Sequence, residues 1–181
     1  AAGIYNTSLL NCYSTCDVNG TSNIGGMVGY CELSTVINCH SSGNVTHSIN
    51  NIGGDIGGFV GKCIGSSLSK NYSAGNVIAT GGTSTGIYNG GFVGMAESFY
   101  FDPYQPNEIT DCYSSGNVNG GYYTCGFVGY NYISLGSSMI SNCYSRGVIS
   151  GEGTLLPFAG TNNNDGSINN NFYDADVDGL A

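Results

Sequence analysis

Hydrophobic positions recur in a fixed order along the chain. In six segments an aliphatic residue is followed four residues later by an aromatic residue or histidine, and five residues after that by Val or Ile. The first set is Leu9, Val36, Leu68, Ile109, Ile140 and Ile168, the second is Tyr13, His40, Tyr72, Tyr113, Tyr144 and Phe172, and the third is Val18, Val45, Val77, Val118, Ile149 and Val177. Period-two spacing in such short runs predicts β-strands, and no segment predicts an amphipathic helix.

A second motif, Gly-Gly-Phe-Val-Gly, alternates with these segments. It predicts a further short strand, whose glycines allow close backbone packing. Its copies begin at Gly25, Gly57, Gly90, Cys125 and Leu156, at intervals of 32, 33, 35 and 31 residues. Ser-Gly-Asn, which follows His40 and Tyr113, predicts a turn or bend, because Gly and Asn tolerate positive φ. The period predicts one array of stacked units, with boundaries near 1–24, 25–56, 57–89, 90–124, 125–155 and 156–181.

Units of this length and content predict an all-β fold, a β-solenoid of about five to six coils of roughly 31 residues. Equivalent residues of successive coils would then lie about 4.8 Å apart and form ladders along the axis. A β-propeller is the alternative, but its blades need roughly 40 to 50 residues, which is longer than most units here.

Both motifs together resemble a known repeat family. Gly57-Gly58-Phe59-Val60-Gly61 and Asn38-Cys39-His40-Ser41-Ser42-Gly43-Asn44-Val45 resemble the GLUG-motif repeats. These repeats occur in large secreted and surface proteins of bacteria, many of them adhesin-like. The resemblance covers nearly the whole chain and implies an extracellular or cell-surface location. It carries over no catalytic residue, because the family shares none.

Composition narrows the classes of function. The chain has a net charge of −9 and only three basic residues, Lys62, Lys70 and Arg146. Nucleic-acid binding and a polybasic membrane anchor both need clustered Lys and Arg, so neither is expected. No apolar run approaches the roughly 20 residues that span a bilayer. Eight cysteines and a start at Ala1 favour a secreted, mature protein.

Six of the cysteines occupy equivalent positions in adjacent units. The coil spacing lies within the range that a disulfide needs, which predicts the pairs Cys12–Cys39, Cys31–Cys63 and Cys112–Cys143. The alternative is a ladder of buried free thiols. Cys16 and Cys125 lie several coils apart, so they are expected to be free, re-paired with the other cysteines or bonded between molecules. Zinc is not expected, because Cys-x-x-Cys clusters are missing.

Three further groups of residues are candidate sites. Sequons at Asn6, Asn19, Asn44 and Asn71 permit N-glycosylation. The insertion at 98–106 carries Phe99, Tyr100, Phe101 and Tyr104, which could contact a glycan or another subunit, or could cover the side of the solenoid. Asp174, Asp176 and Asp178 match the first half of a calcium loop, although a solvated terminal coil is the preferred interpretation. No cofactor other than calcium is suggested.

An enzyme is not expected, because the carboxylates are scattered and the two histidines are far apart. An ice-binding solenoid is disfavoured too, because no regular Thr-x-Thr face occurs. The array begins and ends within a unit, which predicts open strand edges. The leading hypothesis is therefore an extracellular structural subunit that assembles end to end into a fibre. The alternative is a cell-surface adhesin module that binds glycans through the aromatic insertion.

Overall fold

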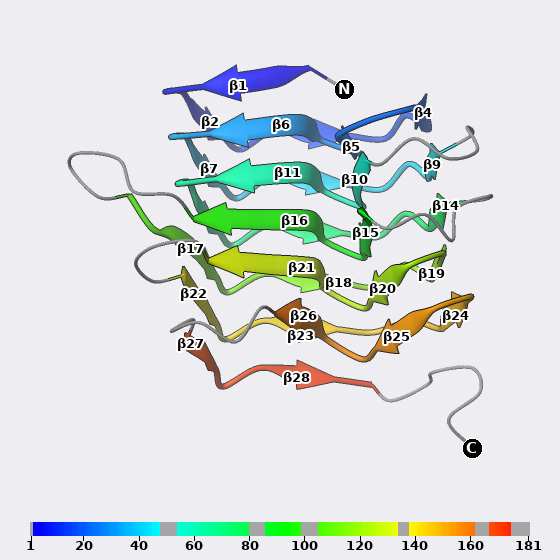
Figure 1. Cartoon of the computed structure of the whole chain (residues 1–181). Coiled ribbons are helices and arrows are strands. Elements are labelled where there is room, and N and C mark those ends of the chain that lie inside the picture. The colour runs from blue at the N-terminus through cyan, green and yellow to red at the C-terminus, as the bar shows by residue number, and fades with distance from the viewer. Residues whose placement is uncertain are drawn as a thin grey trace.

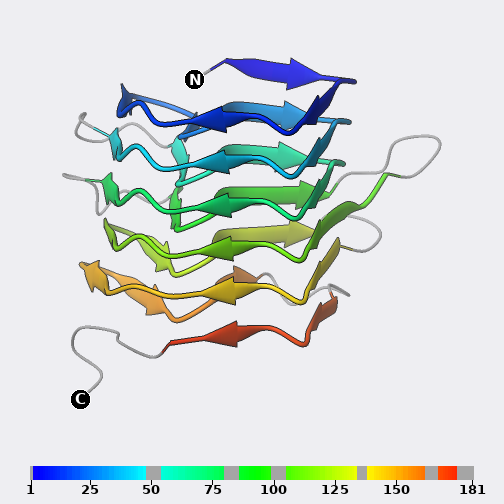
Figure 2. The same cartoon turned by 180° about the vertical axis from the view of Figure 1, so that it is seen from behind.

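The computed structural model describes residues 2–47, 54–79, 86–98, 105–133, 138–161 and 167–174. These residues form short strands stacked into a rod, with β1 at one end and β28 at the other (Figures 1 and 2). Every strand pairing is parallel and joins equivalent segments of successive coils. The prediction of an all-β β-solenoid is confirmed.

Three six-stranded sheets and two five-stranded sheets run along the rod. Sheet A contains β1 (Gly3–Tyr5), β6 (Val28–Glu32), β11 (Val60–Ile64), β16 (Val93–Ser98), β21 (Val128–Ile133) and β26 (Ala159–Thr161). Sheet B contains β2 (Ser8–Leu10), β7 (Thr35–Ile37), β12 (Ser67–Ser69), β17 (Asn107–Thr110), β22 (Ser138–Ser141) and β27 (Ser167–Asn169). Sheet C contains β3 (Tyr13–Ser14), β8 (His40–Ser41), β13 (Tyr72–Ser73), β18 (Tyr113–Ser114), β23 (Tyr144–Ser145) and β28 (Phe172–Tyr173).

The remaining sheets complete each coil. Sheet D contains β4 (Val18–Gly20), β9 (Val45–His47), β14 (Val77–Ala79), β19 (Val118–Gly120) and β24 (Ile149–Gly151). Sheet E contains β5 (Ile24–Gly25), β10 (Gly54–Gly57), β15 (Ile87–Gly90), β20 (Tyr123–Cys125) and β25 (Thr154–Leu156).

The predicted ladders are present. Val36, Leu68 and Ile109 pair directly across sheet B and are fully buried. Val45, Val77 and Val118 do the same in sheet D. Because each apolar side chain lies above its counterpart, the core is a set of continuous apolar columns.

A column of phenylalanines forms the centre of the core and corrects one prediction. The Gly-Gly-Phe-Val-Gly motif is not one strand, because β10 ends at Gly57 and β11 begins at Val60, with a bend between them. This bend turns Phe59 inward, where its ring stacks on Phe92 at a centroid distance of 4.9 Å. Phe127 and Phe158 continue the column at the same spacing.

The predicted bend after the aromatic ladder is present, for example at Gly43 and Gly75, and Gly147 at the same corner has φ of 125°. Positive φ angles of other residues gather at another corner. Six residues just before the aromatic ladder have φ between 53° and 57°: Asn11, Asn38, Lys70, Asp111, Asn142 and Asn170. Gly43, in Ser-Gly-Asn, is instead required by close packing, because a Cβ there would lie 2.0 Å from the carbonyl oxygen of Cys16. Gly75 has the same role, with 1.9 Å to the carbonyl oxygen of Gly43.

Candidate functional sites

The two ends of the rod expose the last members of the apolar and aromatic ladders. The ring of Tyr13 stacks on that of His40 at a centroid distance of 5.5 Å, and Tyr13 as a whole is 70% exposed. At the opposite end Phe172 pairs with Tyr144 and is 63% exposed. Ile168, the last member of the apolar ladder in sheet B, is 36% exposed, and Leu9, its first member at the opposite end, is half-buried. Over the described residues, each end therefore presents apolar side chains beside the edge strands of sheets A, B and C.

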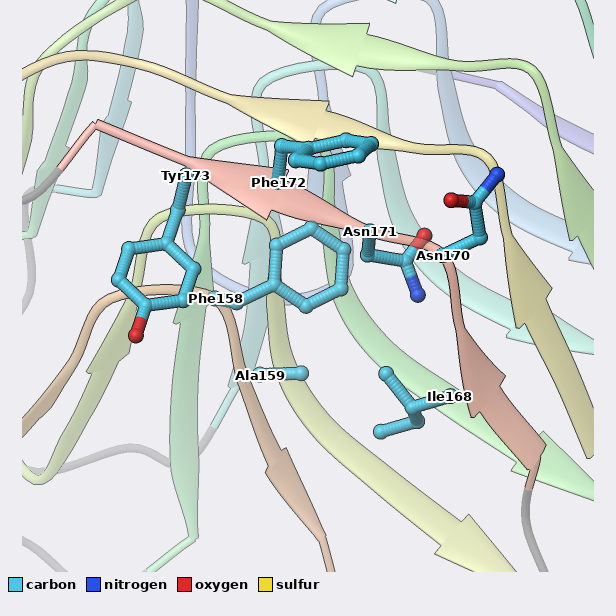
Figure 3. A pocket seen from close by; sticks show the side chains of 7 residues that line it. All are labelled: Phe158, Ala159, Ile168, Asn170, Asn171, Phe172 and Tyr173. Atoms are coloured by element: carbon cyan, nitrogen blue, oxygen red, sulfur yellow. The ribbon is translucent and has the colours of Figure 1, made fainter.

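A hollow of about 400 Å³ opens beside β28 at the C-terminal end (Figure 3). Phe158, Ile168 and Phe172 supply its apolar lining, and Asn170 and Asn171 supply amide groups. Phe158 is the last ring of the phenylalanine column, so the hollow lies where a further ring of that column would stack. It can accept an apolar side chain from another molecule.

Cys16 marks the corner after β3 at the N-terminal end. It is the counterpart of Gly43, Gly75 and Gly116, where an added Cβ would meet the carbonyl oxygen of the preceding coil at 1.9 to 2.0 Å. A side chain at this corner therefore points away from the following coils, and Cys16 is exposed. A coil cannot pack on this corner in the regular geometry.

The predicted cysteine pairs are brought together, but all eight cysteines are free thiols. Cys31 and Cys63 are register partners in sheet A, and their side chains hydrogen-bond to each other. The backbone N–H of Cys12 donates to Cys39 Sγ at 3.3 Å. The three predicted disulfides are therefore not formed in the structure, although their partners are adjacent.

The remaining predicted pair, Cys112 and Cys143, is also brought together, as the repeat spacing requires. Cys112 and Cys143 hydrogen-bond to each other, and burial is the larger cause that raises the pKa of Cys112. Cys125 is fully buried, and burial raises the pKa of its thiol to about 12. Cys125 therefore cannot reach another molecule, which corrects the intermolecular option for this residue. Cys16 alone keeps that option.

The four sequons differ in accessibility. Asn71 is 1% exposed; its Oδ1 accepts from the Cys39 N–H and its Nδ2 donates to the Val36 carbonyl, both at 2.8 Å. It takes the place of a cysteine in its ladder, so the prediction that it could be glycosylated is wrong for the folded protein. Asn6 and Asn19 are exposed and Asn44 is half-buried, which leaves these three as predictions.

Two other predicted sites fall largely outside the described residues. Phe99, Tyr100, Phe101 and Tyr104 all do, and so do Asp176 and Asp178. The N–H of Asp174 donates to the Ser145 carbonyl at 3.0 Å, which continues the coil as a solvated strand end would. Within the described ranges no three His, Cys, Asp or Glu side chains gather to hold a metal ion.

A tyrosine-rich surface, which the sequence analysis did not identify, lies where sheet E folds over the outside of sheet A. Glycine permits this approach: a Cβ at Gly94 in β16 would lie 2.4 Å from the backbone N of Ile56 in β10. Tyr88 of β15 stacks on Tyr130 of β21 at 4.6 Å. The signal in the sequence is position: Asp55, Tyr88 and Tyr123 each lie two residues before the second motif or its equivalent.

Three charged side chains extend this surface toward the N-terminal end. Lys62 Nζ lies 2.5 Å from Glu97 Oε2, and both side chains are largely shielded from solvent. Asp55 is 7% exposed, and burial raises the pKa of its carboxyl to about 7, opposed by the charge of Lys62 and reinforced by that of Glu97. The surface therefore combines partly exposed aromatic rings and hydroxyls with two buried carboxyl groups at its edge.

Comparison with known proteins adds no assignment. No family model, curated protein or solved structure matches this chain. The resemblance to GLUG-motif repeats stays a prediction. Over the described part of the chain, no helix is long and apolar enough to cross a membrane.

Proposed function

We propose that this chain is an extracellular, non-enzymatic structural subunit whose copies stack head to tail into a fibre. The observation that carries the proposal is the match between the two ends. The edge strands β26, β27 and β28 belong to the same three sheets as the opposite edge strands β1, β2 and β3. A second copy placed on the C-terminal end continues these three sheets in parallel pairing.

The ladders support the same arrangement. In the stacked pair, Tyr13 of one copy covers Phe172 of the other, as His40 already covers Tyr13 within the chain. Burying an aromatic or aliphatic side chain of this size contributes about 1.5–3 kcal/mol, so a junction that covers several of them provides a substantial driving force. The hollow beside Phe158 would then receive Ile4 or Met27, which pack partly buried against the core at the N-terminal end.

Cys16 limits how far the junction extends. Regular packing covers sheets A, B and C and stops at the Cys16 corner, where a Cβ meets the next backbone. The junction is therefore weaker than a coil-to-coil contact inside the rod. In an oxidising environment the exposed Cys16 thiol and the paired cysteines provide positions for disulfides, and Asn6, Asn19 and Asn44 provide positions for glycans.

The proposal is tested by sedimentation velocity over a series of protein concentrations. Phe172→Asp and Tyr13→Asp place a charge in the junction and are expected to keep the protein monomeric while circular dichroism stays unchanged. Tyr113→Asp is the matched control, because Tyr113 lies in the same ladder but away from both ends and is 41% exposed. Association of all three variants equal to that of the unmodified protein would refute the junction, as would an unmodified protein that stays monomeric at every concentration.

A further inference from the structure

The side of the rod carries a second surface, separate from the ends. Five tyrosines contribute to it. Tyr88 and Tyr123 lie in sheet E, Tyr122 directly precedes strand β20 of that sheet, and Tyr130 and Tyr132 lie in sheet A. Neighbouring ring centroids lie 4.6 to 6.4 Å apart, and every one of the five side chains is partly exposed. We call this set the tyrosine surface.

These rings are not an ordinary apolar patch. Each carries a hydroxyl group, and Asp55 is the direct register partner of Tyr88, so a carboxyl group adjoins the rings. Lys62, Met95 and Tyr130 follow one another in sheet A, which brings the Lys62–Glu97 ion pair to the same surface. Aromatic faces next to hydrogen-bonding groups suit a ligand that has apolar C–H faces and hydroxyl edges.

We propose that the tyrosine surface, with Asp55, Lys62 and Glu97 at its edge, binds a neutral glycan chain. Sugar rings present C–H groups that pack on tyrosine rings and hydroxyls that bond to the tyrosine hydroxyls, whereas the carboxyl groups of Asp55 and Glu97 are buried at the edge of the surface. Equivalent positions in successive coils lie about 4.8 Å apart along this surface. That spacing is close to the length of one sugar unit in an extended chain, so Tyr88 and Tyr123, which are register partners in adjacent coils, can meet neighbouring sugars.

Charge selects a neutral glycan over an anionic one. Among the residues that the structure describes, the one cation at this surface is Lys62, which is already paired with Glu97, and Asp55 lies beside them. The whole chain has a net charge of −9. A uronate or sialylated chain would therefore meet repulsion without a free cation to offset it.

This site is independent of the fibre junction. Its strands β15, β20 and β21 lie along the side of the rod, whereas β28 lies at its end (Figure 1). Tyr13 and Phe172 belong to β3 and β28, the two edge strands of sheet C. The monomeric variant Phe172→Asp is therefore expected to bind glycan as the unmodified protein does. Failure of the junction and failure of glycan binding give separate results.

The test is isothermal titration calorimetry with cellohexaose, maltohexaose and chitohexaose as neutral probes and hexagalacturonate as the anionic probe. At least one neutral probe is expected to bind, and Tyr130→Ser is expected to raise its Kd by about ten-fold or more. Tyr113→Ser, in the aromatic ladder of sheet C, is the matched control and is expected to leave the Kd within about two-fold.

Hydrogen exchange of the unmodified protein gives a second measurement that needs no variant. Addition of the bound hexasaccharide is expected to slow exchange in β15, β20 and β21 and to leave β13 and β18 unchanged. The proposal is overturned if no neutral probe binds at millimolar concentration, if only hexagalacturonate binds, or if protection appears at sheet C instead. Equal loss of affinity in Tyr130→Ser and Tyr113→Ser would overturn it as well.

Discussion

Replacing Asn71 by alanine removes a hydrogen-bonding group from the interior of the solenoid. The Asn71 side chain accepts from the Cys39 N–H and donates to the Val36 carbonyl, and it is 1% exposed. The variant leaves both backbone groups buried without these partners. Each such loss costs about 1–3 kcal/mol, so Asn71→Ala is expected to reduce the free energy of unfolding by about 2–6 kcal/mol.

Two matched variants separate this cause from simple loss of volume. Asn71→Cys restores the residue type of the neighbouring coils, where Cys39 Sγ accepts from the Cys12 N–H and Cys112 Sγ donates to the Leu68 carbonyl at 3.5 Å. It is expected to cost less than about 1.5 kcal/mol. Asn171→Ala breaks the equivalent bonds in a half-exposed position near the C-terminal end, where water replaces them, and is expected to cost about 1 kcal/mol.

Urea unfolding of the three variants followed by circular dichroism gives the free energies, and hydrogen exchange at the Cys39 amide locates the loss. The reasoning is refuted if Asn71→Ala and Asn71→Cys unfold within about 0.5 kcal/mol of each other, because uncertainties of a few tenths are typical of such comparisons. It is also refuted if Asn71→Ala costs no more than Asn171→Ala.

Three other perturbations follow from the same structure. Gly75→Ala places a Cβ 1.9 Å from a carbonyl oxygen and is expected to cost about 3 kcal/mol or more, whereas Cys16→Ala at the equivalent end position is expected to be neutral in thermal unfolding. Burial raises the folded-state pKa of Asp55 to about 7, so the free energy of unfolding is expected to fall as pH rises from about 4 to 7 and then to level off, by at most about 4 kcal/mol in total. Asp55→Asn should remove this pH dependence. Oxidation of Cys31 with Cys63 is expected to give an intact-mass loss of two hydrogens and to add about 3–4 kcal/mol in non-reducing urea, an increase that Cys31→Ser should abolish.

The stacking could be predicted from the sequence because it depends on period alone. Val36, Leu68 and Ile109 stand at one position of the repeat, and parallel pairing of the units must place them in one column. The adjacency of Cys31 and Cys63 follows from the same argument. Such register is a property of the whole array, so the irregular insertions between motifs did not obscure it.

The corners and the tyrosine surface could not be predicted in the same way. Lys70 has φ of 57°, a conformation imposed by the neighbouring coils and not by the preference of lysine. The contact of Tyr88 with Tyr130 depends on how sheet E folds over sheet A, and nothing in one repeat specifies that angle. The buried role of Asn71 was hidden because its sequon suggested an exposed side chain, although its place in the cysteine ladder was a usable signal.

The most direct test of end-to-end assembly is electron cryo-microscopy of the protein concentrated under oxidising conditions. The account predicts unbranched rods in which parallel strands repeat every 4.8 Å or so along the axis and subunits repeat about every 29 Å, six strand spacings of sheet A. Density for Phe172 of one subunit should lie against Tyr13 of the next. Dispersed single particles, or rods in which these two residues are far apart, would contradict it.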